Sequence, residues 1–258
     1  MKIAVIGLGL IGGSIFKRLR KEGLDVIGIS ASQSGENISS DYELLSDCDV
    51  VFVASPMNLV PSVLEKISNI VKQTTIVTDV CSLKGFLLSR EYPFNFIPSH
   101  PMAGTEFKGF EHSFESMFEG AKWVITPLNE NQDTTVLEDL IMKMGAKPVY
   151  ATAEEHDKAV ALISHAPMVI AQAIFKAIEG NDLALKLASS GFRDMTRLAM
   201  SNTEMAKDMI ELNSFNIQNS LLKVYASIGE LLEHYDETNL TQIAEKRMLM
   251  YKDGKNVL

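Results

Sequence analysis

The fold is decided by the stretch Lys2-Ile3-Ala4-Val5-Ile6-Gly7-Leu8-Gly9-Leu10-Ile11-Gly12-Gly13-Ser14. Residues 3–6 are apolar, as expected of a strand that is buried on both faces. A G-x-G-x-x-G pattern follows at once, and Ile15, Phe16 and Leu19 then recur at helical spacing. Residues 24–30 have the composition of a second strand. The glycine pattern therefore stands between a predicted strand and a predicted helix, inside a βαβ unit.

Glycines in this context are typical of a dinucleotide-binding site, whereas the pattern alone would be weak. They permit a tight turn and the close approach of a pyrophosphate, and the helix N-terminus offers free N–H groups and a positive dipole. We therefore expect Gly7, Gly9, Leu10, Ile11 and Gly12 to bind the cofactor. The alternative is a glycine-rich turn without a ligand.

The end of the second predicted strand bears on the type of coenzyme. An Asp or Glu at this place binds the ribose 2′-hydroxyl of NAD, but the chain reads Ser30-Ala31-Ser32-Gln33 and its first acid is Glu36. Hydroxyls and an amide can bind a 2′-phosphate, although no arginine stands at or beside Ala31. We expect Ser30, Ala31 and Ser32 to contact the cofactor, with NADP favoured and NAD possible.

Strand-like segments continue at 49–56, 75–80, 94–98, 122–127 and 147–150, the last of which is expected to close the sheet. The segment 60–71 and the residues before Met144 predict helices. Ser55-Pro56 and Ser82 follow strands at the edge where ligands bind in open α/β sheets. We expect Ser55 and Pro56 to contact the cofactor. Ser82 either contacts the nicotinamide or substrate, or caps the following helix.

A dense group of polar residues occurs in Ser99-His100-Pro101-Met102-Ala103-Gly104-Thr105-Glu106. Pro101 biases His100 away from helix, and Gly104 lets the backbone approach a ligand. The stretch predicts a stiff loop that presents His100 at a strand end, where its imidazole can exchange a proton with a pKa near the ordinary value of about 6.5. The alternative is a surface turn with an incidental histidine.

The second half of the chain, from Thr152 onward, shows no strand pattern. Residues 154–178 predict one helix kinked near Pro167, residues 205–235 a long helical run broken near Asn213, and residues 239–250 the last helix. Residues 189–197 interrupt this pattern, and Ser201-x-x-Glu204 resembles a capping box. We predict a Rossmann-type dinucleotide-binding α/β domain over residues 1–150, followed by an all-α domain over residues 151–258.

Composition restricts the class of partner. The chain of 258 residues carries 33 acidic and 24 basic residues, a net charge of −9, which argues against nucleic acid. Cys48 and Cys81 lack the spacing of a disulfide pair, which is typical of a protein in the reducing cytoplasm. The apolar run 3–6 is too short for a signal peptide or a membrane span. No cluster has metal-ligand spacing. We expect no metal, membrane or nucleic acid partner.

The remaining histidines are interpreted from their surroundings. His165 lies beside the predicted kink in an apolar helix, where a core histidine is more common than a catalyst. His112, His156 and His234 fall on predicted loops or helix surfaces, and we interpret them as solvated.

Five stretches together resemble the prephenate/arogenate dehydrogenase family of tyrosine synthesis, over nearly the whole chain. They are residues 7–14, Thr78-Asp79-Val80-x-Ser82-x-Lys84, residues 99–106, Ile163-Ser164-His165-x-Pro167 and Ala188-Ser189-Ser190-Gly191-Phe192-Arg193-Asp194-x-Thr196-Arg197. The region of Ser30 looks more like that of the NADP-using arogenate dehydrogenases.

The resemblance implies that a hydride moves from ring carbon C4 of prephenate or arogenate to the nicotinamide. The ring carboxylate then leaves as CO2 and a phenol results. It also implies that His100 takes the 4-hydroxyl proton and that Ser82 orients this region.

For the substrate, the resemblance implies that Arg197 pairs with a carboxylate and that His165 lines the pocket. Gly104, Thr105 and Glu106 would lie beside the substrate, with Glu106 close enough to couple with Arg197.

The residue types suit this chemistry independently. Hydride departure creates a carbonyl at C4, so a base must take the hydroxyl proton, which neutral imidazole can do at pH 7. A doubly anionic substrate in an acidic protein needs a fixed cation, and arginine supplies bidentate geometry.

Two alternatives stay open. One is another NAD(P)-dependent dehydrogenase or reductase with a helical C-terminal domain, such as a β-hydroxyacid dehydrogenase or an imine reductase, which would not need the loop around His100. The other is a non-catalytic NAD(P)-binding sensor, which would bind the cofactor without turnover.

Apolar stripes on the helical half are too extensive for one thin domain to cover. A long seam is predicted from Leu212, Ile217, Leu221, Val224, Ile228 and Leu231. We expect a homodimer through the helical domains, and the family resemblance supports this.

Overall fold

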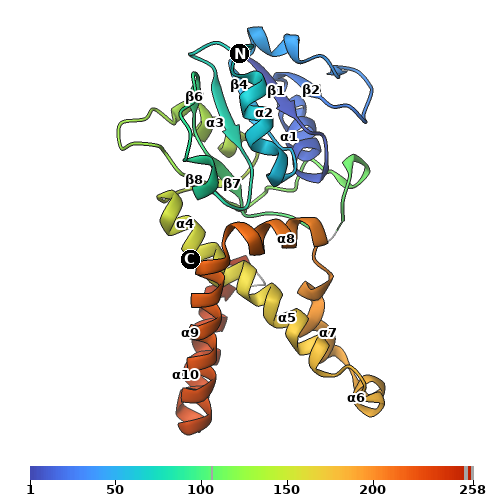
Figure 1. Cartoon of the computed structure of the whole chain (residues 1–258), viewed down its shortest axis with the longest axis vertical. Coiled ribbons are helices and arrows are strands. Elements are labelled where there is room, and N and C mark those ends of the chain that lie inside the picture. Colours follow the sequence, from blue (N-terminus) through green and yellow to red (C-terminus); the bar gives the residue numbers. More distant parts are fainter. Residues whose placement is uncertain (106, 253–254, 257–258) are drawn as a thin grey trace. The chain divides into compact units, whose positions relative to one another are not determined.

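The computed structural model in Figure 1 describes residues 1–105, 107–252 and 255–256. The chain divides into two compact units, Met1–Ile217 and Gln218–Leu258. The first unit holds both larger sheets and the helices that pack on them. These units do not coincide with the predicted dinucleotide-binding domain (residues 1–150) and all-α domain (residues 151–258), so the domain boundary near residue 150 stays a prediction.

The larger sheet has six parallel strands in the order β3-β2-β1-β4-β5-β6. They are β1 (Lys2–Ile6), β2 (Asp25–Ile29), β3 (Ile38–Ser39), β4 (Val50–Val53), β5 (Ile76–Asp79) and β6 (Asn95–Phe96). The order reverses between β1 and β4, which is the switch point of a doubly wound fold, where dinucleotides bind. The predicted Rossmann-type architecture is confirmed.

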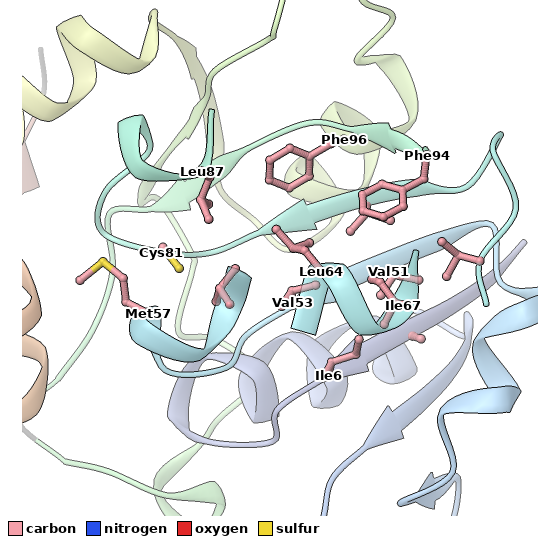
Figure 2. Close-up of a cluster of buried hydrophobic side chains, with 14 of the residues drawn as sticks. Ile6, Val51, Val53, Met57, Leu64, Ile67, Cys81, Leu87, Phe94 and Phe96 are labelled. Atoms are coloured by element: carbon pink, nitrogen blue, oxygen red, sulfur yellow. The ribbon is translucent and has the colours of Figure 1, made fainter. Parts of the chain in front are cut away.

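Helices cover both faces of this sheet, so most residues of its central strands β1 and β4 are apolar and buried. The helices are α1 (Leu10–Lys21), α2 (Val60–Ile67) and α3 (Thr135–Lys143). Val51 and Val53 of β4 pack with Leu64 and Ile67 of α2, together with Phe94 and Phe96 (Figure 2). The alternate residues of β4, Val50 and Phe52, belong to a second cluster with side chains of α1 and α3.

Short 3-10 helices lie in the segments that connect these elements. They are η1 (Tyr42–Asp47), η2 (Met57–Leu59), η3 (Gly85–Leu87) and η4 (Phe110–His112).

A separate three-stranded sheet corrects the expectation that residues 147–150 close the first one. It consists of β7 (Ser99–Pro101), antiparallel to β8 (Lys122–Ile125), which is parallel to β9 (Lys147–Tyr150). The chain changes sheets at Pro98, which has no N–H to continue the ladder. Ile97 N still donates to Val77 O at 2.9 Å, whereas Pro98 O accepts from Thr126 N at 2.9 Å.

The helical half begins with one continuous helix, as predicted for residues 154–178. It comprises α4 (Ala153–Val160), the π-helical segment η5 (Ala161–His165) and α5 (Ala166–Ala177). The expected irregularity near Pro167 is a π-helical turn that precedes the proline. A capping box of Thr152 and Glu155 starts α4.

Shorter helices complete the first unit, and two predictions about them are wrong. They are α6 (Asp182–Leu187), α7 (Ser190–Thr196), η6 (Arg197–Met200) and α8 (Thr203–Leu212). Most of the segment 189–197 is therefore helical, with a break only at Ala188 and Ser189. Asn202, and not Ser201, caps α8, because its side chain accepts from the N–H groups of Glu204 and Met205.

The last part of the chain is formed by α9 (Ser214–Glu233), α10 (Glu237–Met250), β10 (Tyr251–Lys252) and β11 (Lys255–Asn256). The predicted break at Asn213 and the last helix are confirmed. The short β10 and β11 pair antiparallel, in a region where no strand was expected.

By length and composition alone, the helix Ala153–Ala177 could cross a membrane. Helices from the core of a protein pass the same test, so this property is weak support for a membrane span. The absence of a membrane partner stays a prediction.

Candidate active site

The glycine turn after β1 has the geometry that a pyrophosphate requires. Gly7 has a φ of +88°, and a Cβ on Gly12 would stand 2.0 Å from Gly7 O, so neither position accepts a side chain. No other atom lies within 4 Å of the Cβ position of Gly9, so the backbone there is open to a ligand. Gly9 is the N-cap of α1, whose first N–H groups have no partner inside the helix. These residues fit a dinucleotide.

The loop after β2 carries the residues expected at the adenosine ribose. Ser30 Oγ accepts hydrogen bonds from Ser32 N at 3.3 Å and Gln33 N at 3.1 Å, while Ala31 and Ser32 are exposed. The acid Glu36 pairs with Arg20 of α1 at 3.2 Å. The structure therefore brings an arginine to this loop that the sequence pattern did not reveal.

Ser55 and Pro56 follow β4 at the same carboxyl edge of the sheet. A Cβ on Gly7 would stand 3.0 Å from Ser55 N, so this backbone lies against the glycine turn. Both residues are placed where contact with a dinucleotide was expected.

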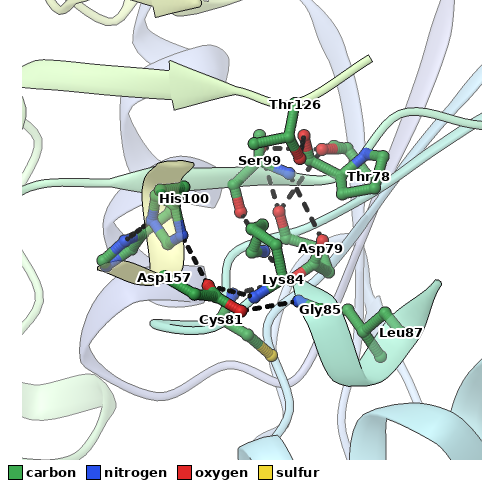
Figure 3. Close-up of polar contacts among 12 residues, drawn as sticks. Thr78, Asp79, Cys81, Lys84, Gly85, Leu87, Ser99, His100, Thr126 and Asp157 are labelled. Atoms are coloured by element: carbon green, nitrogen blue, oxygen red, sulfur yellow. Dashed lines mark hydrogen bonds and ion pairs between the residues drawn. The ribbon is translucent and has the colours of Figure 1, made fainter. Parts of the chain in front are cut away.

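His100 does not lie in a loop, because it belongs to β7 and pairs with Val124 of β8. Its ring, labelled in Figure 3, is partly buried. Nδ1 of this ring lies 2.9 Å from Nε2 of His156. His156 Nδ1 in turn lies 2.8 Å from Oδ1 of Asp157. Our interpretation of His156 as solvated is wrong, since it is 2% exposed, whereas His112 and His234 are exposed as expected.

The carboxylate of Asp157 also binds the loop that carries Ser82. Its two oxygens accept from Lys84 N at 2.9 Å and Gly85 N at 2.8 Å. Ser82 itself is partly exposed. The helical turn that follows, η3, has Lys84 as its N-cap and no side-chain capping bond, so Ser82 does not cap it.

A buried ion pair joins the end of β5 to the start of β7. Lys84 and Asp79 are fully buried and in contact, and Lys84 Nζ also donates to Ser99 O at 2.6 Å. Asp79 accepts further hydrogen bonds from Cys81 N at 2.9 Å and Ser99 N at 3.3 Å. The pair holds the strand of His100 beside the loop of Ser82. Sequence reasoning assigned it no role, although both residues stand in a stretch quoted for the resemblance.

His165 lies in the π-helical segment and is 1% exposed. Asn213 Nδ2 lies 3.3 Å from His165 Nδ1 and donates to Asp157 O at 2.9 Å. Asn213, at the break between α8 and α9, thus links His165 to the backbone beside His156. It was not predicted as a site residue.

Three of the other expected substrate residues are open to solvent. Arg197 is exposed at the start of η6, which packs on α5, and it forms no ion pair with any other residue of the described ranges. Gly104 and Thr105 are exposed, and Thr105 Oγ1 accepts from Phe107 N at 3.2 Å. Glu106 lies outside the residues that the structure describes. Within the described residues, no hydrogen bond or ion pair joins Arg197 to His100.

The lowered pKa values of His100 and His165 keep both imidazoles neutral at pH 7. Burial lowers the pKa of His100 well below its usual 6.5, and the neighbouring His156, Lys84 and His165 lower it further. The expected pKa near 6.5 is therefore too high. Burial also lowers the pKa of His165 to about 4, against an opposing effect of Asp157. A neutral imidazole is the form in which a histidine can accept a proton.

Because these histidines have lowered pKa values, we expect the free energy of unfolding to decrease as the pH drops below about 6.5. An unfolded histidine binds a proton there, whereas folded His165 stays neutral down to about 4, so unfolding takes up protons. At about 1.4 kcal/mol per pKa unit, His165 alone should remove about 2 kcal/mol between pH 6.5 and 5. Urea titrations across this range measure the loss, and His165→Gln should reduce it. A free energy of unfolding that rises on acidification would contradict this.

The chain is similar to known proteins over nearly its whole length. Residues 17–151 match the model described as prephenate dehydrogenase, nucleotide-binding domain, and residues 152–246 match prephenate dehydrogenase, dimerization domain. The prephenate dehydrogenase of Lactococcus lactis subsp. cremoris is 29% identical over 270 residues, which cover 92% of this chain and 75% of that protein.

Solved structures agree with these matches. The arogenate dehydrogenase of Synechocystis is 32% identical, with a TM-score of 0.81 over 95% of this chain and 97% of that one. A prephenate dehydrogenase from A. aeolicus, in complex with hydroxyphenyl propionate and NAD+, is 26% identical, with a TM-score of 0.85 over 96% and 98% of the two chains.

Proposed function

This chain belongs to the prephenate dehydrogenase family of NAD(P)-dependent enzymes, and we propose that it oxidatively decarboxylates arogenate or prephenate with NADP as the preferred coenzyme. The observation that carries the proposal is the position of the His100 imidazole, which lies on β7 and is joined through His156 and Asp157 to the loop of Ser82 that follows β5 of the dinucleotide-binding sheet. Residues 1–150 would bind the dinucleotide, and residues 151–258 would bind substrate and form the dimer.

Each proposed site residue has one task in this reaction. The glycine turn before α1 would hold the dinucleotide, whose nicotinamide would supply the acceptor for the hydride of C4. His100 takes the proton of the 4-hydroxyl, and Ser82, on the loop fixed by Asp157, orients that group. Decarboxylation needs little help, because it makes the ring aromatic.

Substrate binding is assigned to the residues that lie open to solvent and to His165. Arg197, which has no ion pair within the described ranges, holds a substrate carboxylate. His165 lines the pocket, and Gly104, Thr105 and Glu106 complete it.

The reaction is tested by supplying the purified chain with both substrates and both coenzymes. Turnover of at least one substrate should release one CO2 for each reduced coenzyme. Reduction of coenzyme without CO2, or no turnover in any of the four combinations, would contradict the proposal. Coenzyme binding without turnover would favour a sensor.

Replacing Ser30 should reverse the coenzyme preference. Its Oγ already accepts from the N–H groups of Ser32 and Gln33, so the carboxylate of Ser30→Asp can keep this turn. The new charge would repel a 2′-phosphate, which should lower the ratio of kcat/KM for NADP over NAD about 10–10²-fold. Ser30→Asn keeps the turn without the charge and is the matched control. A wild-type chain that prefers NAD would refute the proposal.

The proposed homodimer predicts twice the 28.5 kDa mass of one chain in sedimentation at micromolar concentration. Of the predicted seam, Leu212, Ile228 and Leu231 are 37–51% exposed, whereas Ile217 is buried within the chain and cannot contribute. Further large apolar side chains are exposed in α9, namely Phe215, Leu222, Tyr225 and Leu232, and Leu249 is exposed in α10. A monomer at these concentrations would count against the dimer.

A cytoplasmic location is the final part of the proposal. Cys48 and Cys81 are both free and buried, which is consistent with a reducing compartment.

A further inference from the structure

We propose that His156 and Asp157 are positioning residues that hold His100 in a single tautomer, with the proton on Nδ1 and the lone pair on Nε2. Nε2 is then the atom that accepts the proton of the substrate. This inference rests on the proposed role of His100 as the base and specifies how the chain prepares it.

The direction of the hydrogen bonds is set at Asp157. Its Oδ1 accepts from the N–H of Lys84 and its Oδ2 from the N–H of Gly85, so both oxygens face donors. An ionised carboxylate has no proton to give. The 2.8 Å contact from Oδ1 to His156 Nδ1 therefore requires a proton on that nitrogen.

The hydrogen bond between the rings of His156 and His100 has a direction that follows from the one at Asp157. Our proposal takes His156 as neutral, in which case a proton on its Nδ1 leaves only a lone pair at Nε2. The 2.9 Å contact between this nitrogen and His100 Nδ1 therefore requires the proton on His100. Nε2 of His100 keeps its lone pair, and it makes no hydrogen bond to another residue in the described part of the chain.

Burial protects this arrangement from water. The side chains of His156 and Asp157 are 1% and 13% exposed, so solvent cannot readily replace either bond. The nearby ammonium of Lys84 is occupied by Asp79 and Ser99 O. His165, on the neighbouring π-helical segment, is bonded to Asn213. None of the charged or titratable groups around His100 competes for its Nδ1.

Two variants of His156 separate tautomer control from packing. His156→Phe keeps the volume of a ring but removes the acceptor, so His100 should populate both tautomers. His156→Gln restores a carbonyl oxygen that can accept from His100 Nδ1 and an amide that can donate toward Asp157. Asp157 itself is a poorer target, because its loss would also release the loop of Ser82.

The test is the nitrogen-15 spectrum of histidine-labelled protein without substrate, in which the two tautomers give different ring shifts. The wild-type protein should show His100 protonated at Nδ1 only. His156→Phe should mix the tautomers and lower kcat about 10–10²-fold with unchanged coenzyme affinity, and His156→Gln should recover most of the loss. His234→Phe, at an exposed histidine, should change neither quantity.

A wild-type His100 that carries its proton on Nε2 would overturn the inference. So would a folded His156→Phe protein with an unchanged tautomer and kcat. If His156→Phe does not fold, the wild-type and His156→Gln spectra still decide. Because the spectrum needs no turnover, a chain inactive on both substrates would refute the proposed function separately.

Discussion

Replacing His100 with Asn should lower kcat about 10²–10⁴-fold, which is the usual loss when general-base help is removed. The amide can still donate toward His156 Nε2, so the buried contact of the wild-type ring has a substitute. Because the proposed dinucleotide site consists of other residues, coenzyme affinity should be retained. Steady-state kinetics and a coenzyme titration measure the two quantities.

His234→Asn, at an exposed position, is the matched control and should keep the wild-type kcat. A folded His100→Asn enzyme with near-normal kcat would remove the base from this mechanism, and Ser82 or a bound water would become the candidate. A variant that loses stability or coenzyme affinity but keeps kcat would show that His100 only shapes its strand.

Replacing Arg197 with Gln should weaken substrate binding by about 2–4 kcal/mol, roughly 30- to 10³-fold in KM, as for one partner of a desolvated charge pair. The free chain offers Arg197 no ion pair within the described ranges, so no internal ion pair is lost with it. Arg193 lies four residues earlier, is exposed and pairs with Asp194 on the surface. Arg193→Gln should therefore change KM little. An equal loss of NADP affinity in Arg197→Gln would mean that Arg197 is structural.

The dinucleotide half could be predicted from the sequence because its signals are local. The glycines between β1 and α1 lie within a few residues of one another, and the apolar composition of each strand indicates that the strand is buried. The change of sheet at Pro98 was missed, because the segments 94–98 and 122–127 carry the same strand pattern whichever sheet they join. The proline marks the position but does not specify the partner strand.

His156 and Asp157 could not be recognised for a similar reason. Next to Glu154 and Glu155 they have the composition of a solvated first helical turn. They are buried because α4 packs against η3 and because His100, 56 residues earlier, lies against the ring of His156. Asp79 and Lys84 follow an apolar strand, which could have suggested a buried pair, but only the path of the turn brings them into contact.

The pH dependence of kcat/KM tests the central claim, that neutral His100 accepts the 4-hydroxyl proton, most directly, because this ratio reports the ionisation of the free enzyme. The account predicts a rate that stays level through pH 6.5 and falls only in more acidic solution, where His100 becomes protonated. Circular dichroism at each pH distinguishes this fall from unfolding. In His100→Asn the acid limb should disappear. An acid limb at or above pH 6.5 that persists in the variant would contradict the claim.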